Sequence, residues 1–176
     1  GSNDDTTMIN IIRTSFDQFT YKESGGAVHI TNCGLKCKSA TFKNCESSNG
    51  GGGAIYVKNK NRLANNVDLT KLTFVQCKSS YGGAMYIYSE SEKNKVNIIS
   101  CTFRSNSLLN SASDGKSGGS ALYLTVKEGS IDNCNFYGGE KGNLIKVENN
   151  FEGAKKLTHH SYAKNNGVLT ISRCSF

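Results

Sequence analysis

Gly52-Gly53-Ala54-Ile55-Tyr56-Val57 is the stretch around which this chain of 176 residues is organised. The same pattern returns at residues 82–87 as Gly-Gly-Ala-Met-Tyr-Ile, and in looser form at residues 25–30 and 119–124. Because a unit that recurs every few tens of residues is the mark of a repeat architecture, these copies are the first evidence on the fold.

A second pattern lies between the Gly-Gly-Ala units and ends on a phenylalanine. It occurs six times, ending at Phe16, Phe42, Phe74, Phe103, Phe136 and Phe176. The positions seven, five and two before each Phe hold small or apolar residues, with mostly polar residues between them. Gaps of two, three and two residues are an alternation broken once, which predicts two short strands joined by a bend.

The Gly-Gly-Ala unit predicts a third strand in each repeat. Its apolar positions, such as Ile55 and Val57, face one way, and the residue between them faces the other way. Three short strands in a repeat of about thirty residues predict one turn of a β-solenoid, whose stacked coils share one core. We therefore expect an all-β fold of about six coils over residues 9–176. Residues 1–8 are expected to be a tag-cleavage remnant, Gly1-Ser2, with a flexible or capping segment.

Composition and charge limit the functions that this chain can have. The chain has no proline, which suits strands paired on both sides, and no apolar run long enough to cross a membrane. The net charge of +7 favours an anionic partner, but the lysines are dispersed, so a solvated surface is the alternative. No nucleic-acid-binding motif is present. Insertions of differing length, at 58–66, 88–95, 107–117 and 148–167, are expected to be loops at the sides of the stack.

The seven cysteines fall mostly into columns. Relative to the Phe, one column contains Cys101, Cys134 and Cys174, and a second contains Cys45 and Cys77. Side chains stacked in register do not readily adopt a disulfide torsion, so we expect a ladder of buried thiols. Cys33 with Cys37 is the pair to test for a disulfide, with Cys45 as the other partner for Cys33. No zinc-ligand spacing occurs, and no metal or cofactor is expected.

The outward column of the Gly-Gly-Ala strands is the candidate binding site. It consists of His29, Tyr56, Tyr86, Tyr123 and Lys146. One interpretation is an aromatic strip that binds sugar rings or a partner protein. The other is that the stacked rings only stabilise one face of the solenoid.

An enzymatic role would require clustered carboxylates. Carbohydrate-cleaving β-helices use Asp or Glu residues from adjacent coils. Here the acidic residues do not share one column, since Asp68 and Asp132 differ in position relative to their Phe. His159 and His160 have no carboxylate partner assigned by the sequence, and loop histidines are the simpler interpretation. No catalytic residue is therefore assigned.

Gly-Gly-Ala followed by an apolar residue, alternating with Phe-x-x-Asn, resembles the repeats of the polymorphic outer-membrane protein family. Phe-x-x-Asn is complete at Phe103–Asn106, whereas Cys45 and Cys77 stand where the family has Asn. The resemblance covers most of residues 9–147. It implies a right-handed, single-stranded parallel β-helix of the pectin lyase-like fold, on a cell surface, working by adhesion. It carries over no catalytic residues.

We expect a non-enzymatic, extracellular, adhesin-like fragment that binds a glycan or protein of a host or matrix. A carbohydrate-active enzyme and a structural spacer are the alternatives. The last coil stops at Phe176 in mid-repeat, so we expect a longer protein. Its bare strand edges would pair with further coils, with a partner or end to end with another copy.

Overall fold

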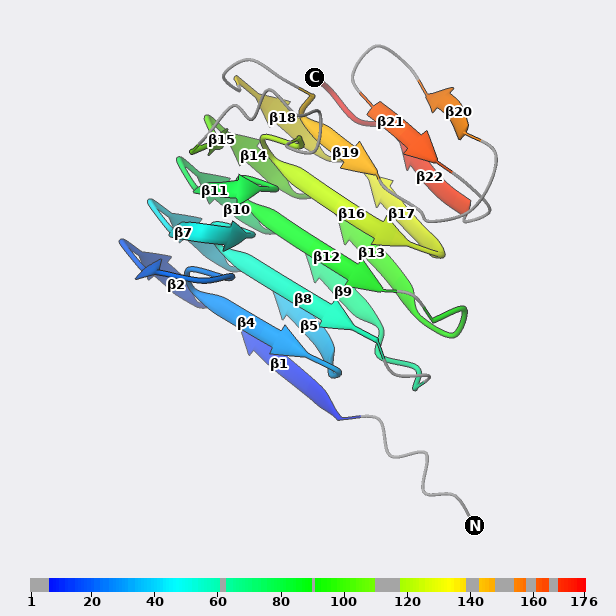
Figure 1. Cartoon of the computed structure of the whole chain (residues 1–176), viewed down its shortest axis with the longest axis horizontal. Coiled ribbons are helices and arrows are strands. Elements are labelled where there is room, and N and C mark those ends of the chain that lie inside the picture. Colours follow the sequence, from blue (N-terminus) through cyan, green and yellow to red (C-terminus); the bar gives the residue numbers. More distant parts are fainter. Residues whose placement is uncertain are drawn as a thin grey trace.

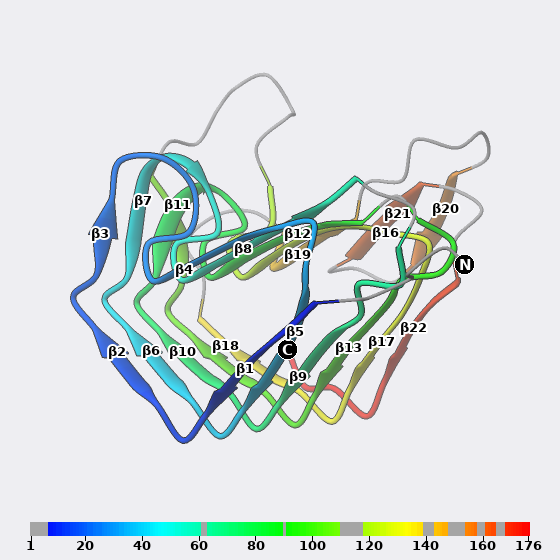
Figure 2. The same ribbon diagram turned by 90° about the horizontal axis from the view of Figure 1, so that it is seen from below.

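Parallel strands stacked in four sheets make up the structure, a computed structural model that describes residues 7–60, 63–89, 91–109, 118–138, 143–147, 154–157, 161–164 and 168–176. Every regular element within these residues is a β-strand. The chain passes through the four sheets in turn and then begins the next coil (Figures 1 and 2). Four successive turns contain a strand of every sheet, so the described residues form a β-solenoid.

The four sheets, A to D, are the sides of the solenoid in Figure 2. Sheet A contains β1 (Met8–Ile12), β5 (Gly34–Lys38), β9 (Val67–Thr70), β13 (Lys95–Ile99), β17 (Glu128–Asp132) and β22 (Val168–Ser172). Sheet B contains β2 (Ser15–Asp17), β6 (Thr41–Lys43), β10 (Thr73–Val75), β14 (Thr102–Arg104) and β18 (Asn135–Tyr137). Sheet C contains β3 (Thr20–Tyr21), β7 (Glu46–Gly51), β11 (Lys78–Tyr81) and β15 (Ser107–Leu108). Sheet D contains β4 (Val28–Thr31), β8 (Ile55–Asn59), β12 (Met85–Ser89), β16 (Leu122–Val126), β19 (Ile145–Val147), β20 (Ala154–Leu157) and β21 (Ser161–Lys164).

The pairing is in register, so equivalent residues of successive coils lie side by side. Phe74 pairs with Phe42 on one side and with Phe103 on the other. The rings of the six aligned phenylalanines form a continuous stack, with centroids 4.7–5.2 Å apart and planes within 6° of parallel. The four central rings are completely buried or nearly so. This stack runs through the core, beside the aliphatic columns from sheets A and D.

The bend predicted three residues before each Phe is a left-handed backbone position. Lys71 has φ 55° there, and Arg13, Ser39, Ser100, Asn133 and Arg173 occupy the same position in the other coils. The Lys71 N–H donates to the carbonyl of Ile99 in the next coil at 3.0 Å. Because that bond repeats from coil to coil, the structure holds non-glycine residues in a conformation that they seldom adopt. The broken alternation therefore marks the corner between sheets A and B.

The prediction of three strands per repeat is wrong, because each complete coil contains four. The additional strands are those of sheet C, and their sequences are polar, as in Glu46–Gly51. The inward residues of its two central strands, β7 and β11, include Ser47 and Ser79, both fully buried. The Ser79 hydroxyl hydrogen-bonds to the carbonyls of Tyr81 and Gly82, at 2.8 and 3.0 Å. The Ser47 hydroxyl donates to the carbonyl of Glu23 in the preceding coil. Serines hydrogen-bonded to backbone carbonyls therefore occupy inward positions here, so no apolar periodicity shows the strand in the sequence.

The two glycines of the repeat have different tasks at the corner between sheets C and D. The first has a positive φ, +67° at Gly52 and +59° at Gly82, which suits a residue without Cβ. The second lies against the next coil, since a Cβ on Gly53 would lie 2.3 Å from the carbonyl oxygen of Gly83. The motif that organises the sequence therefore forms the tightest corner of the coil.

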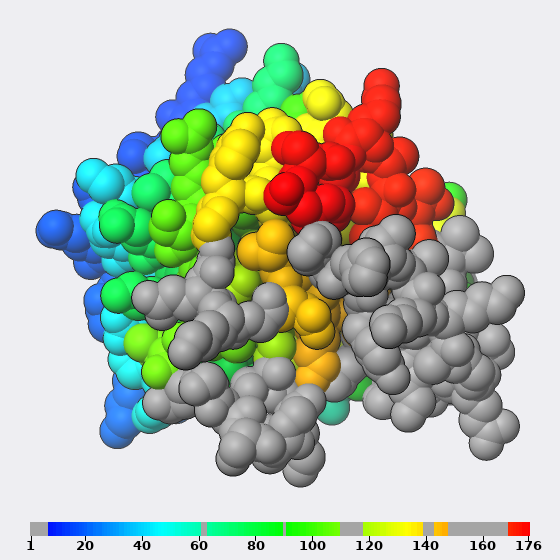
Figure 3. Space-filling view, turned by 90° about the horizontal axis from the view of Figure 1, so that it is seen from above, coloured from blue at the N-terminus to red at the C-terminus, as the bar shows by residue number. Residues whose placement is uncertain are grey.

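The two ends of the solenoid differ. In the first coil, Ile9, Ile12 and Phe19 are 40–56% exposed. At the other end, shown in Figure 3 with residues 168–176 in red, the insertion predicted to be a loop contributes β20 and β21, which pair antiparallel. β21 continues sheet D beyond β19. No helix among the described residues is long and apolar enough to cross a membrane.

Candidate functional site

The predicted outward column lies on sheet D and is continuous. His29 pairs in register with Tyr56, Tyr56 with Tyr86, Tyr86 with Tyr123, and Tyr123 with Lys146. Neighbouring ring centroids lie 4.8–5.1 Å apart, and the tyrosine planes are within 19° of parallel. The structure thus assembles these five residues, called here the ladder, into one stack along the axis.

Stacking covers the faces of the ladder rings. The Tyr86 ring lies between Tyr56 and Tyr123, and the Lys146 ammonium lies 5.3 Å from the centroid of Tyr123. Tyr123 and Lys146 are only 7% and 8% exposed, whereas Tyr56 and Tyr86 are half-buried. Burial raises the pKa of the Tyr56 hydroxyl, which therefore stays protonated at neutral pH. A ligand meets ring edges and hydroxyls here, because the faces that a sugar ring would need are occupied.

A second outward column of sheet D lies beside the ladder. Lys58 pairs with Thr31 on one side and with Tyr88 on the other, and Tyr88 pairs with Thr125. The Lys60 ammonium lies 5.8 Å from the centroid of the Tyr88 ring, a cation–π contact. Sequence reasoning singled out only the ladder, although the alternation of the Gly-Gly-Ala strand also marked this second column, two residues further along.

The seven strands of sheet D contain no acidic residue. Their lysines are Lys58, Lys146, Lys155, Lys156 and Lys164, and their tyrosines are Tyr56, Tyr86, Tyr88, Tyr123 and Tyr162. Sheet A, in contrast, has both signs, with an ion pair of 2.8 Å between Lys95 and Glu128. The strands of sheet D therefore combine lysines and tyrosines without an acidic residue, and among their described side chains Lys58 is the lysine that is partly exposed.

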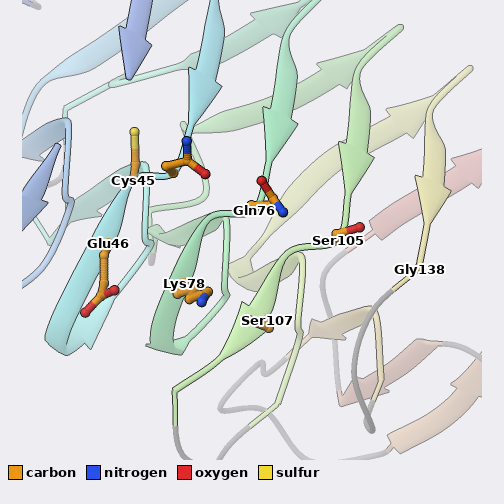
Figure 4. Close-up of a pocket in the computed structure, with 8 residues that line it drawn as sticks. Cys45, Glu46, Gln76, Lys78, Ser105, Ser107 and Gly138 are labelled. Carbon is orange, nitrogen blue, oxygen red and sulfur yellow. The ribbon is translucent and has the colours of Figure 1, made fainter. Parts of the chain in front are cut away.

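A pocket of about 620 Å³ lies elsewhere, at the corner between sheets B and C (Figure 4). Its lining comes from four coils and consists of Asn44, Cys45, Glu46, Gln76, Lys78, Ser105, Ser107 and Gly138. Sequence reasoning missed it. The sequence does show mostly polar residues at two and four positions after the Phe. They become one lining only because the coils stack in register.

The cysteine columns are core positions. All seven cysteines are free thiols in the structure, and Cys33, the candidate for a disulfide with Cys37 or Cys45, is bridged to neither in it. Burial raises the pKa of the Cys37 thiol to about 11. In the column after the Phe, the Cys77 thiol donates to the carbonyl of Phe42 at 3.6 Å. Its hydrogen bond with the Cys45 thiol, together with burial, raises its pKa. The Cys37 and Cys77 thiols are therefore protonated, poor nucleophiles.

Asn106 occupies the Cys45 and Cys77 column in the fourth coil. Its amide donates to the carbonyl of Phe74 in the preceding coil at 3.2 Å, and the Cys77 and Cys45 thiols likewise donate to Phe42 and Phe16, each one coil back. Its side-chain oxygen also accepts a bond of 2.9 Å from the backbone N–H of Cys77. Cys and Asn can therefore occupy the same position of the repeat, because the side chains of both donate to the Phe carbonyl of the preceding coil.

The carboxylates considered for catalysis lie apart and have other partners. The Asp68 carboxylate accepts a bond of 2.8 Å from the Asn97 amide, and Asp132 pairs with Arg173 and Ser172. The described residues contain no group of three side chains able to hold a metal ion. His159 and His160 lie outside the described residues. Comparisons of the chain with models of protein families, with curated proteins and with solved structures give no match.

Proposed function

We propose that this chain belongs to a non-enzymatic, adhesin-like protein of the cell surface, which binds an anionic glycan or protein of a host or matrix through sheet D. We further propose that the solenoid winds right-handed through about six coils, as in the polymorphic outer-membrane protein repeats that its sequence resembles. The six strands of sheet A support that number of coils. A crystal structure would test both points.

The observation that carries the proposed function is the composition of sheet D. Its strands have several lysines and tyrosines and no acidic residue. An anionic ligand lying along this face would meet Lys58 and Lys60, together with the hydroxyl edges of Tyr56 and Tyr86. A tyrosine combines apolar area with a hydrogen-bonding tip, and lysine attracts carboxylate, sulfate or phosphate groups.

Binding is favoured over hydrolysis by the surroundings of the carboxylates. Asp68 and Asp132 are engaged by Asn97 and Arg173, on the outer side of sheet A. A pair of carboxylates facing one substrate would be required for hydrolysis of a glycosidic bond. The described residues that converge on sheet D offer hydroxyls and ammonium groups, which recognise a ligand without cleaving it.

The test is a binding screen against sulfated, carboxylated and neutral glycans and against acidic matrix proteins, at low and high salt. The variant Lys58→Gln/Lys60→Gln removes two charges from sheet D. Its matched control, Lys36→Gln/Lys38→Gln, removes two exposed charges from sheet A. We expect wild type and control to bind an anionic probe at low salt, and the sheet D variant to lose most of that binding.

A second variant distinguishes the contribution of the tyrosine hydroxyls to binding from the contribution of ring stacking to the fold. Tyr56→Phe/Tyr86→Phe keeps the rings and removes two hydroxyls, so the fold should persist while binding weakens. Equal losses in the sheet A and sheet D lysine variants would mean that binding follows net charge alone, and would contradict a site on sheet D. No binding to any probe would favour the structural spacer.

A further inference from the structure

One wall of the pocket between sheets B and C is a column of residues, one from each of four successive coils. Asn44, Gln76, Ser105 and Gly138 each stand two residues after a Phe, at the end of a strand of sheet B. Figure 4 shows Gln76, Ser105 and Gly138 following one another from coil to coil. Successive strands of a sheet lie roughly 4.8 Å apart, so the four positions span roughly 14 Å.

The backbone explains why these side chains form a regular wall. Each of the four residues has a positive φ, between 50° and 53°. The Gln76 N–H donates to the carbonyl of Arg104 in the next coil at 2.9 Å, and Ser105 donates to Tyr137 in the same way. The corner is thus fixed by coil-to-coil hydrogen bonds, and the wall is held ready before a ligand arrives.

The opposite wall comes from the start of sheet C. Glu46 pairs in register with Lys78, and Lys78 with Ser107. One negative and one positive group therefore stand in adjacent coils, so the pocket has no net charge. Its other polar groups are amides and hydroxyls, each of which can donate and accept hydrogen bonds. The strands of sheet D, in contrast, contain lysines and no acidic residue.

The size and chemistry of the pocket select a class of ligand. A volume of about 620 Å³ lies within the range of ligand sites, which is roughly 300–1,000 Å³. The ligand must be extended, uncharged and rich in groups that both donate and accept. A chain of neutral sugars satisfies all these requirements.

We propose that the pocket between sheets B and C binds a neutral oligosaccharide of about three or four units, which lies parallel to the solenoid axis. Each coil meets about one sugar, because the coil spacing of roughly 4.8 Å is comparable to the length of a pyranose ring. Sheet C separates this site from sheet D (Figure 2). The inference therefore goes beyond the proposed function and does not depend on it.

Glycine substitutions test the site without straining the corner. Gln76→Gly/Ser105→Gly removes two exposed side chains where φ is positive, a conformation that glycine adopts readily. Gly138 already occupies this position in the fifth coil. The matched control is Lys71→Gly/Ser100→Gly, at the other corner of the same two coils, where φ is also positive. Circular dichroism and melting temperatures establish that both variants are folded.

Binding would be measured by titration calorimetry with β-linked glucose and mannose oligosaccharides, from the disaccharide to the hexasaccharide. We expect one series to bind with an affinity that rises to the tetrasaccharide and then levels off, and that is insensitive to salt. The pocket variant should lose about tenfold or more, because two ligand hydrogen bonds are removed. The control variant and the sheet D variant Lys58→Gln/Lys60→Gln should bind as wild type does.

Three outcomes would overturn the inference. They are an absence of binding to both series, equal losses in the pocket and control variants, and binding that disappears with added salt. Because the sheet D variant enters the same experiment, loss of anionic binding at sheet D and loss of neutral binding at the pocket are measured separately. Either proposal can therefore fail while the other holds.

Discussion

Individual residues in this solenoid act through their neighbours in adjacent coils. Asp132 on sheet A accepts hydrogen bonds from the Arg173 guanidinium, at 2.9 Å for Nε, and from the Ser172 hydroxyl at 2.8 Å. The Arg173 bond, followed by that from Ser172, lowers the pKa of Asp132 from 3.8 to about 2. A residue in the last coil therefore determines the protonation of one in the coil below it.

This pair should stabilise the fold only where Asp132 is ionised. Because the pKa is lower in the folded chain, the contribution is complete above about pH 4 and is lost as the pH falls towards about 2. We expect Arg173→Gln to lower the urea midpoint at pH 6 and to approach wild type as the pH falls to 2. A difference between the two proteins that stays constant over this range would contradict the assignment.

The second glycine of the repeat is constrained by the close approach of the next coil. In Gly53→Ala, the new Cβ would lie 2.3–2.6 Å from backbone atoms of Gly83 and Lys78, so the coils must separate. We expect a loss of about 1–3 kcal/mol in the free energy of unfolding, measured by urea denaturation. The control is Gly118→Ala, whose Cβ would meet only the flexible Lys146 side chain. A similar loss in both variants would show that close approach is not the cause.

At the scale of elements, each short strand depends on the strands above and below it. A strand such as β10 has three residues and one inward side chain, Phe74, and pairs with β6 and β14. Strands this short bury little area by themselves. Their stability comes from columns that continue through the coils, such as the phenylalanine stack.

Interrupting this stack should therefore be costly. Phe74→Ala removes a fully buried ring from between Phe42 and Phe103, and we expect a loss of about 3–5 kcal/mol in the free energy of unfolding. Val75→Ala is the neighbouring control, since Val75 is on the outer side of the same strand. Its effect should be small by the same denaturant measurement. A loss below 1 kcal/mol for Phe74→Ala would mean that neighbouring coils collapse into the space.

At the scale of the whole molecule, stability should vary along the axis. The third coil, β9 to β12, is paired on both sides in every sheet, whereas β1 to β4 are edge strands. The inward residues of the first coil are also partly exposed, as Ile9 and Phe16 illustrate. A solenoid is stabilised by contacts between neighbouring coils, so a coil with one neighbour opens more easily.

Hydrogen exchange followed by mass spectrometry would measure this gradient. We expect amides of β9 to β12 to exchange slowest and those of β1 to β4 to exchange fastest among the four complete coils. Covering the first coil, by another copy end to end or by a partner, should slow its exchange selectively. Uniform exchange rates over all four coils would contradict the gradient and indicate a single cooperative unit.

The sequence by itself determined the repeat, the inward columns and the ladder of sheet D. These follow from local periodicity, because alternation along one strand sets which side chains are buried. The inward residues that it assigned, such as Ile55, Val57 and Ile87, are buried in the structure. The ladder could also be assembled in advance, since aligned copies of a repeat stack in register.

Only the tertiary structure decided the rest. Sheet C has no apolar pattern, because its inward serines Ser47 and Ser79 are hydrogen-bonded to backbone carbonyls, so hydrophobic periodicity could not reveal it. The stacking that covers the tyrosine faces depends on side-chain rotation, and the pocket depends on the angle between two sheets. Periodicity specifies which residues face outward, but the space between them is set by how the coils fold around their corners.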